Sequence, residues 1–192
     1  MGIGSENRGI YRRDQGIDDS GEEFGAKLAA SRCGRLDSDS EARRFRLPFA
    51  TMRLTPPERL RLADAIADAE RGSAGEIRLH LEERCPGDDA LARARQLFGE
   101  LGLHKTREGT GVLLYVAERD RKTAVYAGPG IHKRVAETFW SGVAREVARG
   151  FGSGRPLDGL AAALAHIGDT LRTHCPGTDV HANEIPNDVS GS

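Results

Sequence analysis

Aromatic residues and cysteines are scarce in this chain of 192 residues, and each shortage excludes a class of protein. Aromatic side chains make up 5% of the residues, and the only cysteines are Cys33, Cys85 and Cys175. No four zinc ligands occur at short spacing, so a sulfur-based zinc site is excluded. Three cysteines in a chain without a signal-like start favour free thiols, with a bridge between Cys85 and Cys175 as the alternative.

Long apolar runs and an excess of charge are also missing. No stretch approaches the roughly 18 apolar residues that a membrane span requires. Residues 1–30 contain no apolar segment of the kind found in a signal peptide, so we expect a cytoplasmic protein. The formal net charge is −1, which provides no clustered basic surface for nucleic acid.

The chain divides into parts of unequal character. Residues 1–51 are rich in Gly, Ser, Arg and Asp and show no hydrophobic period, so we predict a disordered segment or a non-native extension that precedes a start at Met52. A regulatory tail is the alternative for this segment. Residues 52–176 carry the periodic patterns of one folded domain, and residues 177–192 form a polar C-terminal tail.

Helix signals dominate both ends of the predicted domain. Thr55-Pro56-Pro57-Glu58 has the residues of a capping box and begins a helix. A second helix follows Asp89, and a third, amphipathic one follows residue 131. A fourth runs from Pro156 to about His174. The residues expected to face inward are Leu60, Ala63, Ile66 and Ala67, then Leu91, Ala94, Phe98 and Leu101, then Val135, Phe139, Val143 and Val147 with Trp140 beside them, and finally Leu160, Leu164, Ile167 and Leu171.

Strand signals lie between these helices. Residues 76–82 alternate between apolar and polar side chains, which predicts a half-exposed strand with Arg78, His80 and Glu82 on its polar face. The unbroken apolar run at 112–117 is typical of a central strand, and 123–127 should return antiparallel after a short turn. This order of elements predicts an α/β protein, a Rossmann-like three-layer α/β/α sandwich with a small mixed sheet.

Several segments together resemble the TPM domain family, which includes thylakoid-lumen, photosystem-repair and receptor-modulator proteins. The resemblance covers about residues 54–188 and rests on the order and spacing of Gly75–Arg78, Gly111–Ala117, Asp120–Arg121, Gly128–His132, Phe139–Trp140 and Asn183–Pro186. The last of these segments is similar to the tail of the small, stand-alone bacterial branch.

The resemblance implies a shallow acidic pocket at one end of the sheet, associated with calcium or magnesium in some members. Acid phosphatase activity has been attributed to the thylakoid branch. Metal-associated members tend to carry two acids at the turn that here contains Asp120, but Arg119 precedes it in this chain. The membrane anchor common elsewhere in the family is not found here.

Two groups of residues are candidate sites. Acidic residues follow two predicted strands at the edge where open sheets bind ligands: Glu82, Asp88 and Asp89 after the first strand, and Glu118 and Asp120 after the central one. Carboxylate oxygens suit calcium or magnesium. The alternative is that Asp88 or Asp89 caps a helix and Asp120 serves the turn. In the second group, Gly128 and Gly130 precede a helix and could bind an anion, with His132 as an acid or base. A tight turn that needs positive φ is the favoured explanation of the glycines, and an exposed histidine without a chemical role is that of His132.

Two functions follow from these residues. The first is a binding module that takes a divalent cation, a small anionic ligand or an unknown protein partner, without a nucleotide cofactor. The second is a metal-assisted phosphatase-type hydrolase that acts on phosphomonoesters. No catalytic residue is identified by the sequence.

Overall fold

The structure is a computed structural model that describes residues 31–32, 54–106, 108–177 and 188–191. Its helices are α1 (Pro56–Glu70), α2 (Ala90–Glu100), α3 (Pro129–His132), α4 (Glu137–Gly152) and α5 (Pro156–His174), with a short 3₁₀ helix, η1, at Leu103–Lys105. Its strands are β1 (Ser31–Arg32), β2 (Ile77–Glu82), β3 (Val112–Ala117), β4 (Lys122–Ala127) and β5 (Val189–Gly191).

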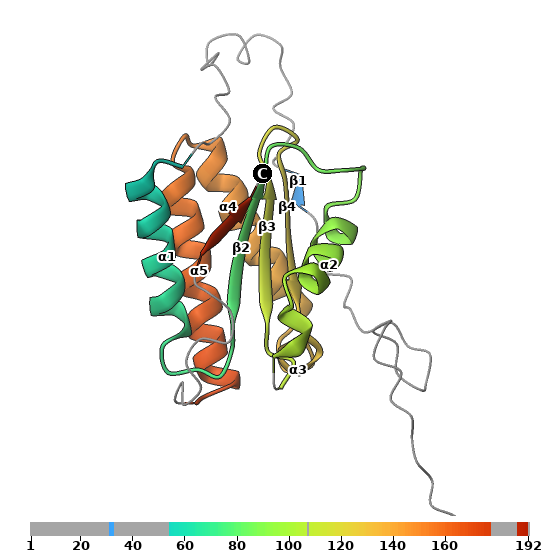
Figure 1. Cartoon of the computed structure of the whole chain (residues 1–192), viewed down its shortest axis with the longest axis vertical. Coiled ribbons are helices and arrows are strands. Elements are labelled where there is room, and N and C mark those ends of the chain that lie inside the picture. The colour runs from blue at the N-terminus through green and yellow to red at the C-terminus, as the bar shows by residue number, and fades with distance from the viewer. Residues whose placement is uncertain (1–30, 33–53, 107, 178–187, 192) are drawn as a thin grey trace, which may run out of the picture.

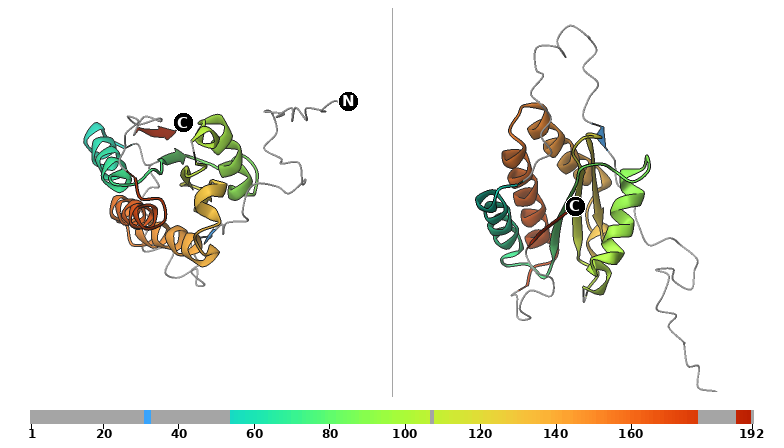
Figure 2. Two further views of the ribbon diagram at one scale, coloured as in Figure 1. Left: turned by 90° about the horizontal axis from the view of Figure 1, so that it is seen from below. Right: turned by 45° about the horizontal axis from the view of Figure 1, so that its top comes forward.

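The strands form one mixed sheet with helices on both faces (Figures 1 and 2). The strand order is β1-β4-β3-β2-β5. Strand β2 pairs in parallel with β3 and β5, whereas β4 pairs antiparallel with β3 and β1. The predicted three-layer α/β/α sandwich and the predicted hairpin are confirmed.

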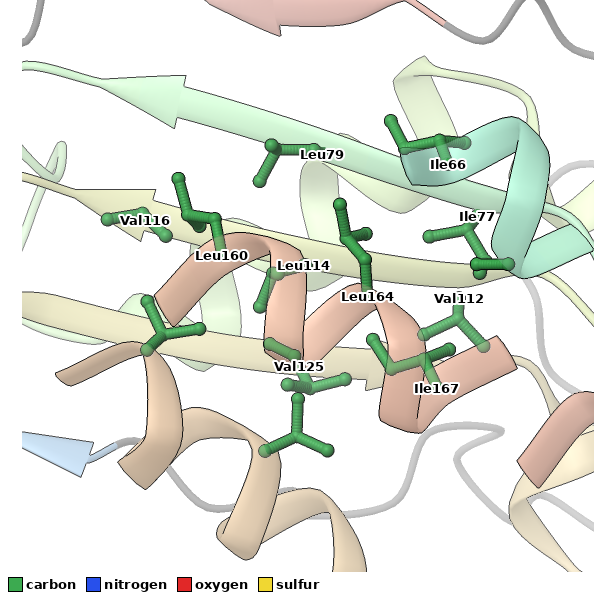
Figure 3. Close-up of a cluster of buried hydrophobic side chains, with 14 of the residues drawn as sticks. Ile66, Ile77, Leu79, Val112, Leu114, Val116, Val125, Leu160, Leu164 and Ile167 are labelled. Atoms are coloured by element: carbon green, nitrogen blue, oxygen red, sulfur yellow. The ribbon is translucent and has the colours of Figure 1, made fainter. Parts of the chain in front are cut away.

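The larger core lies between the sheet and helices α1, α4 and α5 (Figure 3). Leu114 at the centre of β3 and Leu164 on α5 are both fully buried there. All six residues of β3 are buried, as its apolar run predicted. Helix α2 covers the opposite face of the sheet and packs a smaller cluster that includes Phe98, Leu113, Tyr115 and Tyr126.

The predicted inward face of α1 is only partly correct, because Ile66 is buried but Ala63 and Ala67 are half-buried. Leu60 is 63% exposed, and Leu62 is fully buried beside Ile66 instead. Apolar residues occur on more than one side of this alanine-rich helix, so their spacing alone does not fix which side meets the core. The stripe on α5 has no such ambiguity, and its four predicted residues are all buried.

The strand at 76–82 is not half-exposed as predicted, because its polar face is buried as well. His80 is 8% exposed and Glu82 is 6% exposed. The helix predicted to follow residue 131 begins later, at Glu137 of α4, after Ala136 with extended backbone angles. The preceding glycine segment, predicted as a loop, contains the short helix α3.

Two short strands lie in segments for which the sequence predicted no structure. Ser31–Arg32 pairs with the edge of β4, while the rest of residues 1–51 falls outside the described residues. The predicted polar tail contains β5. This strand is held in place by pairing with β2 and by a hydrogen bond of 3.0 Å from the Arg59 side chain to the Val189 carbonyl. Backbone pairing of this kind depends little on side-chain pattern, so it left no signal in the sequence.

Cys85 and Cys175 are buried free thiols, as predicted in preference to a disulfide. Within the described residues, no helix combines the length and apolar character that crossing a bilayer demands.

The orientation of α1 yields a stability prediction. Leu62→Ala should lower the free energy of unfolding by about 2–5 kcal/mol, because it removes a fully buried side chain. Leu60→Ala, on the same helix and equal in chemistry, should change it by no more than about 0.5 kcal/mol. Urea denaturation of both variants checks this, and equal losses would show that α1 is turned differently.

Candidate functional site

The two predicted sites lie at opposite ends of the sheet. The acidic residues follow at the upper end of the sheet in Figure 1. At this end, Glu82 of β2 is in register with Ala117 of β3, which is in register with Lys122 of β4. Val112 and Ala127 are paired at the other end, where Gly128 and α3 follow. The structure therefore does not combine the acidic residues and the glycine loop into one site.

The glycine loop is occupied by contacts within the chain. The Gly128 N–H donates to the Gly111 carbonyl at 2.8 Å, and the Gly130 N–H donates to the Gly109 carbonyl at 2.9 Å. A Cβ at Gly130 would overlap the carbonyl oxygen of Glu108, so close backbone packing explains this glycine. The amides of Gly128 and Gly130 therefore donate within the chain, and anion binding by this loop stays a prediction.

His132, the third member of the predicted anion site, is half-buried at the C-terminus of α3. Its Nδ1 is buried without a hydrogen-bond partner. Burial lowers the pKa of His132, and nearby Glu137 opposes this shift. The side chain is therefore neutral near pH 7, with the carboxylate of Glu137 nearby.

At the upper end, Asp120 joins the β3–β4 turn to the loop between β2 and α2. One carboxylate oxygen accepts the Cys85 N–H at 2.7 Å, and the other accepts Arg84 Nη1 at 3.1 Å. The Arg119 N–H also donates to the Glu83 carbonyl at 2.9 Å. Asp120 thus holds the two loops together, which is a structural role whether or not the site binds a ligand.

The remaining predicted acids have different environments. Asp89 is the N-cap of α2 and accepts the N–H groups of Leu91 and Ala92 at 2.8 and 3.2 Å. The Asp88 carboxylate is fully exposed and lies 3.6 Å from Lys122 Nζ. Glu118 is half-buried at the end of β3. Across the described ranges, no three His, Cys, Asp or Glu side chains are grouped so that they could hold a metal ion by themselves.

A buried polar cluster lies just below this end, centred on the carboxylate of Glu82. The sequence grouped Glu82 with the acidic residues but did not predict its burial with partners from other elements. Arg93 of α2 donates to Glu82 Oε1 through Nη2 at 2.5 Å and through Nε at 3.1 Å. The Tyr115 hydroxyl of β3 donates to Oε2 at 2.8 Å. Burial alone would raise the pKa of Glu82, but the hydrogen bonds from Arg93 and Tyr115 outweigh it and hold the pKa below its ordinary value.

Tyr115 and His80 complete this cluster. Burial, followed by hydrogen bonds with Cys85 and Glu82, raises the pKa of Tyr115 far above its usual range, so the phenol stays protonated. His80 Nδ1 lies 2.9 Å from Ser190 Oγ of β5. Its Nε2 lies 3.3 Å from Glu82 Oε1, without the alignment of a hydrogen bond. Burial lowers the pKa of His80, which Glu82 opposes only in part.

Taken together, the cluster contains an ionised acid, a neutral histidine and a protonated tyrosine. The Glu82 charge is balanced by Arg93, so it is not poised to accept a proton from a substrate. The sequence did contain a signal for this cluster, because the polar face of residues 76–82 contains Arg78, His80 and Glu82. Only the position of α2 in the structure shows that this face of the strand is covered.

Comparison with known proteins places the chain in a family. The TPM domain matches residues 50–170. The chain belongs to the TPM domain family. No curated protein matches it.

Two solved structures are similar to this TPM domain. The BA42 protein of the psychrophilic bacterium Bizionia argentinensis is 33% identical, with a TM-score of 0.66, and the match covers 72% of this chain and 95% of BA42. The N-terminal domain of the cg2496 protein from Corynebacterium glutamicum is 12% identical, with a TM-score of 0.50 over 63% of this chain and 76% of that one. The second likeness concerns the fold alone.

Loss of the buried carboxylate should be costly. Glu82→Gln leaves the largely buried Arg93 guanidinium without its counter-charge, and we expect it to destabilise the domain by about 3–5 kcal/mol. Glu83→Gln removes the partner of Arg119 at a position 43% exposed and should cost about 0–1 kcal/mol. Chemical denaturation of the two variants measures the difference, and similar small effects would contradict a structural charge pair.

The lowered pKa of His80 predicts a pH dependence of stability. The unfolded chain, with a histidine pKa near 6.5, binds a proton more readily than the folded protein does. Stability from this residue is therefore present above pH 6.5 and is lost as the pH falls toward the folded pKa. His80→Gln should flatten the curve of unfolding free energy between pH 7 and 5 (approximate limits taken from the unperturbed pKa).

His132 contributes in the same direction, so part of the slope should remain in His80→Gln. His104→Gln, at an exposed position, controls for the substitution itself. An unchanged slope in His80→Gln would show that burial does not suppress protonation of His80.

Proposed function

We propose that this TPM domain is a binding module without turnover, which takes a divalent cation at the upper end of its sheet. The observation that carries the proposal is a convergence of oxygens in the loop between β2 and α2. The carbonyl oxygens of Gly87 and Asp88 lie 3.4 and 2.9 Å from Lys122 Nζ, and Asp88 Oδ1 lies 3.6 Å from it.

These donors fit calcium better than a transition metal. Calcium accepts backbone carbonyls, carboxylates and several waters in flexible geometry, so it does not need three acidic side chains. Magnesium, which keeps more of its water, could bind through the Asp88 carboxylate. Glu118 and Asp120 would add negative charge nearby, and a small anion such as phosphate would bind through the cation.

The absence of turnover is inferred from how the neighbouring ionisable groups are used. Both oxygens of Asp120 accept hydrogen bonds that hold the loop, and both oxygens of Glu82 accept hydrogen bonds in the cluster below. A hydrolase needs a group free to position or deprotonate water. The alternative, phosphatase-type hydrolysis of phosphomonoesters, would require one of these carboxylates to leave its partners.

We propose the cytoplasm as the compartment. This is supported by the buried free thiols of Cys85 and Cys175, which a reducing environment preserves.

Thermal melting with calcium, magnesium or EDTA tests cation binding. A cation at a hundred times its dissociation constant should stabilise the wild type by about 2.7 kcal/mol. Asp88→Asn should remove this response, because it neutralises a fully exposed carboxylate that lies 3.6 Å from Lys122 Nζ. Asp64→Asn, at an exposed position of α1, should keep it.

Asp120→Asn is a less informative variant, since it also weakens the contact with Arg84 and the β2–α2 loop. Hydrolysis of p-nitrophenyl phosphate, measured under the same conditions, separates the two functions. Cation-dependent turnover that disappears in Asp88→Asn would favour the hydrolase, and no cation response in the wild type would count against the binding module.

A further inference from the structure

Strand β5 is attached to the domain by few contacts. Among the described strands it pairs with β2 alone, at one end of the strand order (Figure 1). Of its three residues only Val189 is buried, and this side chain belongs to the larger core. Short elements with few buried contacts open locally at a lower cost in free energy than the centre of a sheet does. β5 is therefore suited to detach while the rest of the domain stays folded.

One side-chain hydrogen bond joins β5 to a group that titrates near neutral pH. His80 of β2 is in register with Ser190 of β5, and its Nδ1 lies 2.9 Å from Ser190 Oγ. The His80 side chain is only 10% exposed. Detachment of β5 would take Ser190 away from the ring and admit water to Nδ1. Docking of β5 and protonation of His80 are therefore coupled.

The charged groups that face His80 do not belong to β5. Glu82 is on the same strand as His80, Arg93 and Glu100 are on α2, and the Tyr115 ring of β3 is stacked with the imidazole. Glu82 uses both carboxylate oxygens in hydrogen bonds with Arg93 and Tyr115, so it is not a proposed ligand of the cation. All four neighbours stay beside His80 when β5 leaves, and only the burial of the ring changes.

The charged residues close to β5 have other partners. Arg59 donates to the Val189 carbonyl, and the charge of Asp188 acts on Arg78. Neither Arg59 nor Asp188 is among the groups that shift the pKa of His80. The electrostatic difference between docked and released β5 is therefore mainly the hydration of one imidazole ring.

The sign of the coupling follows from the burial. Burial lowers the pKa of His80, and Glu82 opposes this shift only in part. Release of β5 reduces the burial and lets the pKa rise toward its unperturbed value of about 6.5. The released state then binds a proton more tightly than the docked state. Docking is stable above about pH 6.5 and weakens as the pH falls toward the lower pKa of the docked state.

We propose that β5 is an acid-released strand: His80 and Ser190 hold it against β2 while the ring is neutral, and protonation of the ring frees it. Release exposes the backbone of β2 at residues 79–81, which β5 covers by pairing. An exposed strand edge can pair with another extended segment. The released state thus offers a docking surface that the closed state lacks, and this inference does not depend on cation binding.

Amide hydrogen exchange of the full-length chain, followed by NMR between about pH 8 and 5, where histidine titrates, tests the proposal. The protection factors of the β5 amides should fall by up to about tenfold per pH unit below about pH 6.5, the slope for one linked proton. They should lie below those of β3 at every pH, because β5 opens without global unfolding. His80→Gln should abolish the fall, whereas His104→Gln, at an exposed position, should keep it.

A second measurement leaves His80 in place. Val189→Ala removes most of the buried side chain that anchors β5, so the NMR titration of the His80 ring should show a higher pKa than in the wild type. Ser190→Ala takes its place if Val189→Ala does not fold. Equal pKa values of His80 in the wild type and the variant would overturn the proposal. It would also be overturned by β5 protection that does not change with pH, that equals the protection of β3, or that still falls in His80→Gln.

Discussion

The buried carboxylate of Glu82 is the charge on which the arrangement of this sheet depends. It is only 6% exposed and receives hydrogen bonds from Arg93 of α2 and Tyr115 of β3. A buried charge is tolerated only where such partners replace its lost hydration. The position of α2 over the sheet, and the burial of the polar face of β2, are therefore linked to this one residue. His80 extends the link to β5 through Ser190.

The upper end of the sheet is closed by two side chains of opposite charge from the same turn. Asp120 accepts hydrogen bonds from the β2–α2 loop, and Lys122 donates hydrogen bonds to it. The acidic residues that suggest a cation site are consequently not equivalent. Asp89 and Asp120 shape the loop, whereas Asp88 is exposed beside the ammonium of Lys122. Because two of these three carboxylates are used in hydrogen bonds within the chain, counting acidic residues in the sequence overstates how many could contact a cation.

The elements with one unambiguous pattern were predictable from the sequence. The apolar run of β3 and the stripe of α5 are buried as expected. The position of helix α1 was predicted correctly, but Leu60 was assigned to the core instead of Leu62. The reason is that this helix has apolar residues on more than one of its sides. The glycines at 128 and 130 were correctly recognised as special, yet their amides bond to carbonyls of residues 111 and 109, which adjoin them only in the folded chain.

The sequence by itself determined the family, the order of the main helices and strands, and the central place of β3, since each of these depends on periodicity or local spacing. Only the tertiary structure decided which polar groups share an environment. Glu82 meets residues 11 and 33 positions away, and His80 meets one 110 positions away. Contacts between polar groups so far apart leave no local period, because hydrogen bonding requires only that the partners meet, not that they follow one another along the chain.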